Sequence, residues 1–501
     1  MNRTRASLTC LLGAALVSAQ AAAQDPVVPP GFTLQRAVAT ARSYLCLHVE
    51  ADGALLLGTE RSGLWRVRDL DGDGFAEQET CLDPEFVGIQ GLASAPGVIF
   101  AVGRRGEDSG LWRLDLEASS GALSALRPLL LFDGDDEHGV HGVVLGLDGE
   151  LFLVHGDAVQ PRAAADQTPT WAIEGGPTLL EPLPDPGGFG ADRRWPYGSI
   201  LRVNPESGKY ETHAVGLRNP YDLALRADGE WFTVESDMEW NLGLPWYRPV
   251  RLLLVQRGAD FGARPGSAPV RMGWPDMPPA VMELGRGSPT GLVFVEHPLW
   301  PADMQGRLLS GDWSEGRVLA LDIQPDGAGY SASAETFIGG GSALPVTDLE
   351  LAPDGALWMC SGGRGVAGSV WRVLPPQAEH PFAVDPVDRI TAQAQPTSAF
   401  GRAALKLQLE AGGAELVQAL QAVVEDSNAS PLRRQRALLA LVLGDTESAT
   451  TWGAALTTEQ AKAMDPTLLA LMLDVSPHNR ASRASLLGTS AGTRRAWERA
   501  R

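Results

Sequence analysis

The chain has 501 residues, of which 44% are hydrophobic and 20% are charged, an ordinary composition for a large folded protein. Its formal net charge of −20 argues against nucleic acid and against anionic membrane surfaces as partners, because both bind clustered Lys and Arg. Gly and Pro are abundant, at 57 and 36 residues, which suits many turns between short strands.

The N-terminus has the features of a secretory signal peptide. Arg3 and Arg5 precede an apolar run over residues 8–17, and three alanines at 21–23 offer a small-residue cleavage site. We therefore predict a signal peptide over residues 1–23 and a mature protein that is secreted or periplasmic. The apolar run is too short for a spanning helix, and no other stretch reaches the ~20 apolar residues that such a helix needs. No membrane span is expected.

Three cysteines remain after the predicted cleavage: Cys46, Cys81 and Cys360. An odd number leaves at least one thiol free. Cys46 and Cys81 are candidates for a disulfide, although the sequence cannot show the geometry that the bond needs.

One short pattern recurs along the chain: a glycine is followed by alternating apolar residues, often with Arg before the last. The copies begin at Gly63, Gly110, Gly198, Gly316 and Gly368. A repeated unit of this kind is typical of an array of similar supersecondary structures.

Upstream of most copies, an Asp-Gly pair stands between two apolar runs, with glycines at Gly53, Gly149, Gly229 and Gly355. Asp-Gly in this setting predicts a tight hairpin in which both turn residues take positive φ. Each unit is then strand, turn, strand, loop, strand, and six such units fit between about residues 30 and 375. Short antiparallel sheets repeated every ~40–50 residues are typical of a β-propeller. The sequence therefore predicts a mainly β fold, a six-bladed β-propeller over residues 24–374.

Two of the units are overlong, with the excess in residues 157–197 and 235–290. Both stretches are rich in Pro, Gly and Trp. Long loops in a compact domain are usually functional, and we expect these two on one face, around the central channel.

The composition changes after the last repeat. Residues 375–386 form a Pro-rich linker, and residues 387–501 contain few Gly and many Ala and Leu. Helical periodicity appears in residues 403–409, 415–424 and 432–443. We predict a small all-α domain of paired, HEAT-like helices over residues 387–501.

A first candidate site is an acidic loop between two predicted strands. Asp69, Asp71 and Asp73 alternate along it, a spacing that lets hard oxygen ligands converge on one calcium ion. Glu77 could complete a small loop, but Thr80 stands where an EF-hand has its twelfth-position Glu. The alternative is a polar surface turn.

Two histidines, His138 and His141, stand beside carboxylates at the entrance of a predicted strand. A histidine at the mouth of a propeller channel can act as a general base, since its pKa lies near neutrality. The alternative is an ordinary surface histidine. Further along, Arg218 and Asn219 precede Pro220, and their side chains suit a carboxylate or quinone ligand. The alternative there is a structural turn.

A further group of carboxylates lies next to aromatic residues in the second long loop. It consists of Glu235, Asp237 and Glu239. This combination predicts a second metal site or a wall of a substrate pocket.

These motifs resemble the glucose/sorbosone dehydrogenase family, which comprises soluble quinoprotein sugar dehydrogenases. The resemblance is carried by the run from His138 to Asp157 and by Gly-Leu-Arg-Asn-Pro at 216–220. Exported planctomycete-type propeller proteins are similar to the chain at 236–249 and 287–291. The resemblance covers about residues 30–375 and implies a six-bladed propeller that binds pyrroloquinoline quinone and calcium.

By this resemblance, His138 is the general base that takes the proton of the sugar hydroxyl while the quinone accepts a hydride, with His141 as a competing choice. Arg218 and Asn219 are the contacts of the quinone oxygens, and the loop at 235–239 holds the calcium next to the cofactor. Asp157 is expected beside the cofactor as well.

The chain departs from the family where a lysine and two arginines of the last two blades hold the cofactor carboxylates. Ser314, Pro345 and Thr347 stand there instead. An acidic protein without those cations would bind a trianion poorly. Candidates to replace the missing cations are Arg248, Arg264, Arg317 and Arg364.

The chain lacks the C-terminal haem domain of the planctomycete-type proteins, so an external electron acceptor such as a c-type cytochrome is expected. The first hypothesis is therefore an exported dehydrogenase that oxidises a sugar or related alcohol. The second is a non-catalytic propeller that binds a glycan or a protein partner. A hydrolase or lactonase is third, and it requires a calcium ion at the channel centre, held by carboxylates of several blades. Only the dehydrogenase requires His138 and Arg218 to face one pocket with other cations near.

Overall fold

The computed structural model describes residues 26–134, 138–167, 183–241, 244–264, 266, 277–327, 329–339, 344–376 and 385–444. The predicted signal peptide, most of the predicted linker and residues 445–501 of the predicted helical domain lie outside the described residues.

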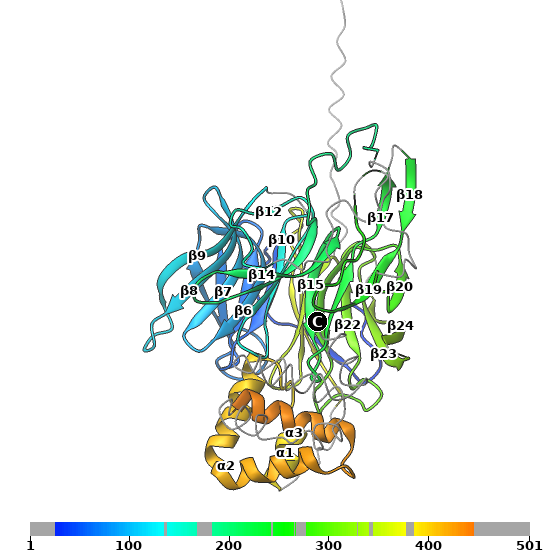
Figure 1. Cartoon of the computed structure of the whole chain (residues 1–501). Helices are drawn as coiled ribbons and strands as arrows, with labels where there is room; N and C mark the ends of the chain where they lie inside the picture. Colours follow the sequence, from blue (N-terminus) through cyan, green and yellow to red (C-terminus); the bar gives the residue numbers. More distant parts are fainter. Residues whose placement is uncertain are drawn as a thin grey trace, which may run out of the picture.

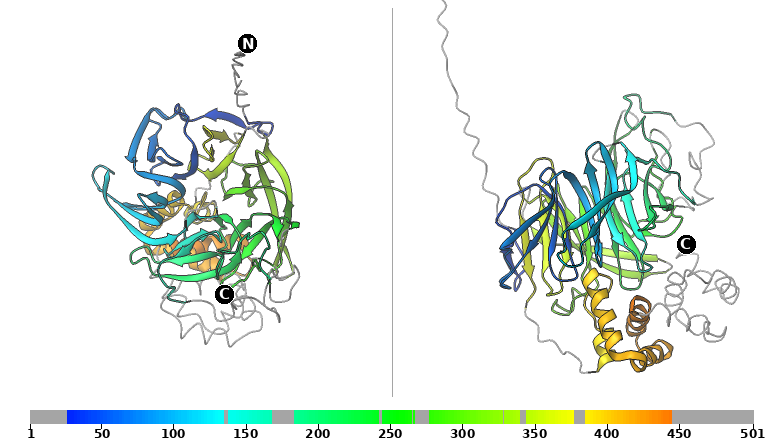
Figure 2. Two further views of the ribbon diagram at one scale, coloured as in Figure 1. Left: turned by 90° about the horizontal axis from the view of Figure 1, so that it is seen from above. Right: turned by 90° about the vertical axis from the view of Figure 1, so that its left-hand side faces the viewer.

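Six antiparallel sheets surround a central axis, which confirms the predicted six-bladed β-propeller (Figure 2). The first strand of each sheet is innermost, and these strands contact one another around the ring. The first blade consists of β2 (Tyr44–Val49), β3 (Leu55–Thr59), β4 (Leu64–Arg68) and β5 (Gln78–Asp83). The second consists of β6 (Phe86–Ala95), β7 (Val98–Arg105), β8 (Asp108–Leu116) and β9 (Leu123–Asp133), with β12 (Gln160–Pro161) added at its outer edge. The third consists of β10 (Val140–Leu145), β11 (Leu151–His155), β13 (Gly198–Val203) and β14 (Tyr210–Leu217).

The remaining blades follow the same order, and the fourth carries an extra hairpin. The fourth blade consists of β15 (Pro220–Leu225), β16 (Trp231–Glu235), β19 (Val250–Val255) and β20 (Met282–Gly285), and its hairpin of β17 (Met238–Asn241) and β18 (Leu244–Arg248). The fifth consists of β21 (Pro289–Phe294), β22 (Leu308–Asp312), β23 (Arg317–Asp326) and β24 (Gly329–Gly339). The sixth consists of β25 (Val346–Leu351), β26 (Leu357–Ser361), β27 (Val370–Leu374) and β1 (Thr33–Arg36).

The ring is closed by a strand from the start of the described chain. β1 pairs antiparallel with β27, with Leu34 opposite Val373. The sixth blade is thus built from two distant parts of the sequence, and this pairing holds the first and last blades together.

The hydrophobic core lies between neighbouring sheets. For example, Phe152 of the third blade packs against Trp231 of the fourth, with ring centroids 4.3 Å apart. Alternating apolar residues give every strand one face toward each neighbouring blade, so that both faces of most sheets are buried. Cys46, Cys81 and Cys360 are all free thiols, and the candidate disulfide is not formed.

The Asp-Gly turns occur where they are predicted, but their conformation differs from the expected one. Only the glycines take positive φ, for example 85° at Gly53 and 83° at Gly149. The aspartate instead uses its side chain: Asp52 Oδ1 accepts a hydrogen bond from Ala54 N at 3.1 Å, and Asp148 Oδ1 accepts one from Glu150 N at 3.1 Å. The Asp-Gly signal therefore reflects an aspartate that bonds its own turn and a glycine that tolerates the left-handed region.

The inner strands approach one another closely around the channel at a narrow region, here called the neck, which includes Gly142 and Gly291. Gly142 and Gly291 leave room there for the carboxylates of Asp222 and Asp348 from the next blades. Asp222 accepts a hydrogen bond from Leu292 N at 2.8 Å, and Asp348 accepts one from Leu47 N at 2.8 Å. Each aspartate therefore connects its own blade to the following one, and the bond from Asp348 connects the last blade to the first.

Three helices cover the end of the channel opposite the β17–β18 hairpin (Figure 1). They are α1 (Pro386–Thr391), α2 (Ala399–Glu425) and α3 (Pro431–Gly444). The predicted helices at 403–409 and 415–424 join into α2, which is interrupted at Gly413, where φ is 56°. The predicted helix at 432–443 corresponds to α3. Among the described helices, none combines the length and the apolar character that a membrane crossing requires.

Arg402 of α2 fixes the helices to the propeller. Its side chain donates to the carbonyls of Leu145 and Gly146 at the end of β10. Burial lowers the pKa of Arg402 to about 10. The backbone of Gln395 donates to the Glu296 carbonyl at 2.8 Å, which adds a second point of attachment.

The close approach at the neck makes a direct prediction about stability. An added Cβ at Gly291 would lie 2.5 Å from Leu349 N and 2.6 Å from Asp348 Cα, which are backbone atoms that cannot easily move. Gly291→Ala is therefore expected to lower the free energy of unfolding by about 1–3 kcal/mol. Gly329→Ala is the matched control, because its added Cβ would meet nothing within 4 Å. Urea unfolding of both variants checks this, and equal midpoints would contradict the close packing of the neck.

Candidate functional site

A small pocket lies at the channel mouth, where β17 begins, and it encloses about 30 Å³. Three segments build its walls: the entrance to β10, the long connection between β11 and β13, and the loops of the fourth blade. The lining residues are His138, Asp157, Phe189, Gly190, Arg193, Tyr197, Arg218, Met238, Ala263 and Arg264. Both overlong units thus contribute to one face, as the sequence predicts.

A histidine–aspartate pair forms the floor of this pocket. His138 Nδ1 lies 2.6 Å from Asp157 Oδ1, and the histidine side chain is 9% exposed. A carboxylate only accepts hydrogen bonds, so the neutral imidazole carries its proton on Nδ1 and leaves the lone pair on Nε2. Gly156 allows this arrangement, because an added Cβ would lie 2.6 Å from the His138 carbonyl oxygen. The structure therefore brings His138 and Asp157 together in a form suited to accept a proton.

Arg218 reaches the same pocket from the loop before β15. Its Nη1 donates to Ser236 Oγ at 3.1 Å and to the Asp237 carbonyl at 2.7 Å. Its carbonyl accepts from Asp157 N at 2.8 Å, which connects the arginine loop to the histidine–aspartate pair.

Glu235, predicted as a metal ligand, organises this loop. Its buried carboxylate accepts hydrogen bonds from the backbone of Arg218 at 3.0 Å and of Asn219 at 2.8 Å. Asp237 is buried nearby, whereas the side chain of Glu239 lies outside the described residues. In the described part of the loop, Glu235 therefore holds the backbone of Arg218 and Asn219 in place.

His141 lies deeper in the channel and does not line the pocket. Its ring stacks on Tyr221 with centroids 4.8 Å apart. Nδ1 contacts Gln90 Oε1, and Nε2 lies 2.8 Å from Asn219 Oδ1. His141 is therefore placed to orient Asn219, and it is not in position to compete with His138 as the base in this pocket.

Two further arginines complete the pocket wall. Arg193 Nε lies 3.2 Å from Asp157 Oδ1, so that it shares this carboxylate with His138. Arg264 pairs with Asp260 at 2.6 Å and lies over the ring of Tyr197 at 5.3 Å. The sequence indicated Arg264 only as one of four candidates, and it gave no sign of Arg193 beyond the length of the loop that contains it.

The other candidate arginines lie outside this pocket. Arg317 pairs with Asp312 at 3.2 Å in a separate small pocket between the fourth and fifth blades. Arg248 is buried at the end of β18, where burial and then Arg251 lower its pKa to about 10. Arg364 is exposed and stacks over the ring of Trp313 at 5.1 Å.

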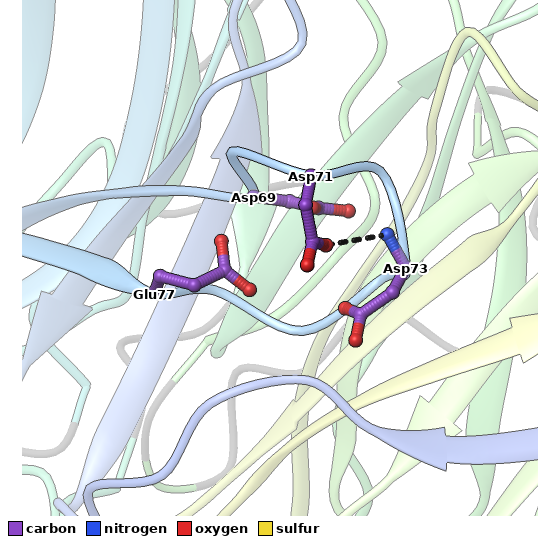
Figure 3. A group of neighbouring side chains, drawn as sticks. All are labelled: Asp69, Asp71, Asp73 and Glu77. Carbon is purple, nitrogen blue, oxygen red and sulfur yellow. Dashed lines mark hydrogen bonds between the residues drawn. The ribbon is translucent and has the colours of Figure 1, made fainter.

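The acidic loop of the first blade brings its four carboxylates together (Figure 3). Oxygens of Asp69, Asp71, Asp73 and Glu77 lie within 4.8 Å of one another, and all four side chains are exposed. Asp69 accepts from the backbone of Gly72 and Gly74, which bends the loop around the cluster. The predicted calcium ligands are therefore neighbours in space.

A second cavity, of about 160 Å³, lies in the channel between the neck and the start of α2. Asp222 and Asp348 line it from two blades, and burial raises the pKa of Asp222 to about 7. Within the described part of the chain, the acidic loop of the first blade is the only group of three or more potential metal ligands that converge. The geometry thus gives no support to a calcium ion held at the channel centre, which a hydrolase or lactonase would need.

No known protein-family model matches the chain, and no curated protein matches its sequence. Several solved structures are similar to it. A Thermus thermophilus protein assigned as an oxidoreductase (glucose dehydrogenase) is 20% identical, with a TM-score of 0.51 over 69% of this chain and 100% of that chain. A family AA12 carbohydrate-active enzyme from Trichoderma reesei is 13% identical, with a TM-score of 0.52 over 72% of this chain and 99% of that chain.

The pyrroloquinoline quinone domain of a pyranose dehydrogenase from Coprinopsis cinerea, in its holo form, is likewise similar. It is 13% identical, with a TM-score of 0.50 over 70% of this chain and 97% of that chain. At these identities the likeness establishes the fold alone: the propeller of this chain has the same fold as these solved structures.

Proposed function

We propose that the protein is an exported oxidoreductase that oxidises a sugar or a related alcohol, with pyrroloquinoline quinone as cofactor and His138 as general base. The observation that carries this proposal is the convergence of His138, Asp157 and Arg218 in one pocket at the channel mouth. A propeller that only binds a partner has no need of this combination. The fold shared with a glucose dehydrogenase-type protein and with a pyranose dehydrogenase domain supports the same assignment.

The chemistry follows from the positions of these side chains. Oxidation of an alcohol removes a proton from its oxygen and a hydride from its carbon. His138 Nε2 takes the proton, and Asp157 holds the ring in place and stabilises the imidazolium that results. Arg218 contributes a fixed positive charge where negative charge develops. Pyrroloquinoline quinone, when bound, would supply the two-electron acceptor, and its reoxidation would require an external acceptor such as a c-type cytochrome.

The residues of the pocket fit such a cofactor in their chemistry. The lining side chains include three guanidinium groups and only one carboxylate. This excess of positive charge suits the binding of quinone oxygens and of the cofactor's carboxylates. The enclosed volume of about 30 Å³ is small for a tricyclic quinone. Binding therefore requires the pocket to widen, and Phe189, which lines it, is 44% exposed.

We also propose that Asp69, Asp71, Asp73 and Glu77 bind calcium. Four carboxylates that share one small space repel one another, and a divalent cation removes this repulsion. This loop belongs to the first blade, so that its role is to stabilise the propeller rather than to contact the substrate.

The proposal makes a direct prediction about activity. The mature protein, loaded with pyrroloquinoline quinone and calcium, is expected to reduce an artificial electron-accepting dye in the presence of an aldose. His138→Asn is expected to lower kcat by about 10²–10⁴-fold, because general-base catalysis contributes on that scale. Asp157→Asn is expected to lower kcat as well, since an amide does not stabilise the imidazolium.

Asp303→Asn is the matched control for the change from acid to amide. Asp303 is exposed and lies outside the pocket, so full activity is expected. The oxidoreductase assignment fails if the wild-type protein binds the quinone but does not reduce the dye with any sugar or alcohol tested. It also fails if His138→Asn keeps wild-type kcat. A non-catalytic propeller that binds a glycan or a protein partner then becomes the better account.

Calcium binding is tested separately by the melting temperature. Calcium that binds only the folded protein must raise the melting temperature. We expect a saturable rise in the wild-type protein, and its loss in Asp71→Asn and Asp73→Asn. Asp326→Asn is the control, because it removes an acidic group outside the loop. A rise of equal size in every variant would show that the acidic loop is not the site.

A further inference from the structure

We propose that Arg193 and Arg264, from the long loops of the third and fourth blades, hold the carboxylates of an anionic ligand in this chain. They take the place of the cations that the last two blades lack. The inference rests on the proposed function only in naming that ligand as a polycarboxylate quinone. The arginine site itself predicts affinity for polycarboxylates in general.

The last two blades offer no substitute at the positions in question. Ser314 Oγ donates to Asp312 Oδ1 at 3.2 Å, and Thr347 Oγ1 donates to the Tyr44 carbonyl at 3.1 Å. These hydroxyls are thus bonded within the propeller, and neither is a cation. Positive charge for a polyanion must come from another part of the pocket.

The pocket concentrates positive charge in a protein that is otherwise strongly acidic. The whole chain has 61 acidic and 41 basic residues. The lining of the pocket reverses this ratio, because Arg193, Arg218 and Arg264 face it together with a single carboxylate, Asp157. Such a local reversal favours an anion at this point.

Arg264 shows an unused donor in this wall. Its side chain is 0% exposed, and Asp260 binds its two terminal nitrogens at 3.1 and 2.6 Å. The rings of Trp195 and Tyr197 lie against the guanidinium at 4.9 and 5.3 Å. Its Nε finds no hydrogen-bond partner among the described residues. A buried N–H without an acceptor is costly, which points to an acceptor supplied by a ligand.

Arg193 sets the position of the ligand relative to the base. Its Nε and His138 Nδ1 both contact Asp157 Oδ1, at 3.2 and 2.6 Å. A ligand carboxylate or quinone oxygen bound by this guanidinium therefore lies next to His138. The arrangement joins the anion site to the site of proton transfer.

Affinity measured by isothermal titration calorimetry tests this assignment. The probes are pyrroloquinoline quinone and the redox-inert benzene-1,3,5-tricarboxylate. Arg193→Gln and Arg264→Gln are each expected to weaken the binding of both probes roughly ten- to hundredfold, as is typical when a charge-assisted hydrogen bond is lost. Arg317→Gln is the matched control and is expected to leave both affinities unchanged, because Arg317 pairs with Asp312 in another pocket.

Arg264 is fully buried, so its variant is interpreted only if its melting temperature shows a folded protein. Arg193, with 14% of its side chain exposed, keeps the test decisive if Arg264→Gln does not fold. Wild-type affinity in Arg193→Gln, or loss of binding in Arg317→Gln alone, overturns the inference.

The two probes separate this inference from the proposed function. If the wild-type protein binds the tricarboxylate through Arg193 but does not bind the quinone, the anion site stands and the quinone-dependent function fails. If it binds the quinone with an affinity that Arg193→Gln does not change, the function survives and this inference fails. Binding of neither probe overturns both.

Discussion

The close approach of six inner strands around the channel is the constraint on which this structure depends. Glycines at the neck allow it, and Asp222 and Asp348 use the space to bond the backbone of the following blade. Because the sheets then fan outward from one axis, all connections between strands must emerge at one of two ends. The β17–β18 hairpin lies at one end, and the helices cover the other (Figure 1). The pocket, which Met238 of β17 lines, lies at the hairpin end.

This division explains where chemistry can occur. The rigid inner strands supply fixed starting points for loops, and the side chains that converge at the mouth leave from the ends of different strands. His138 precedes β10, Asp157 follows β11, and Arg218 precedes β15. Their contacts depend on backbone bonds between these loops, such as the bond from Asp157 N to the Arg218 carbonyl at 2.8 Å. The site is therefore a product of the ring geometry and does not belong to any one blade.

The sequence predicts the repeated parts of the fold well, because each blade carries the same local signals. Four blades contain an Asp-Gly turn, and the second and fifth blades, which lack it, are recognisable from their apolar runs, since both features are short-range. The predicted turn conformation is wrong because the aspartate side chain accepts a hydrogen bond from the backbone two residues on, which a rule about φ alone does not include.

Within the site, the short motifs around His138 and Arg218 predict two residues that the fold brings to one pocket. Arg193 could not be found in this way, since its partner Asp157 is distant in the sequence and the loop between them has no periodic pattern. Arg317 looked equivalent to Arg264 in the sequence, and only the fold shows that they face different pockets.

The central claim is that the pocket at the channel mouth carries out an oxidation. It is tested most directly by the absorption spectrum of the protein loaded with pyrroloquinoline quinone, recorded without oxygen before and after one equivalent of an aldose is added. The account predicts that the spectrum of the oxidised quinone changes to that of the reduced form within a single turnover. A bound quinone whose spectrum stays oxidised with every sugar and alcohol tested would contradict the account, and it would show that this pocket binds but does not catalyse.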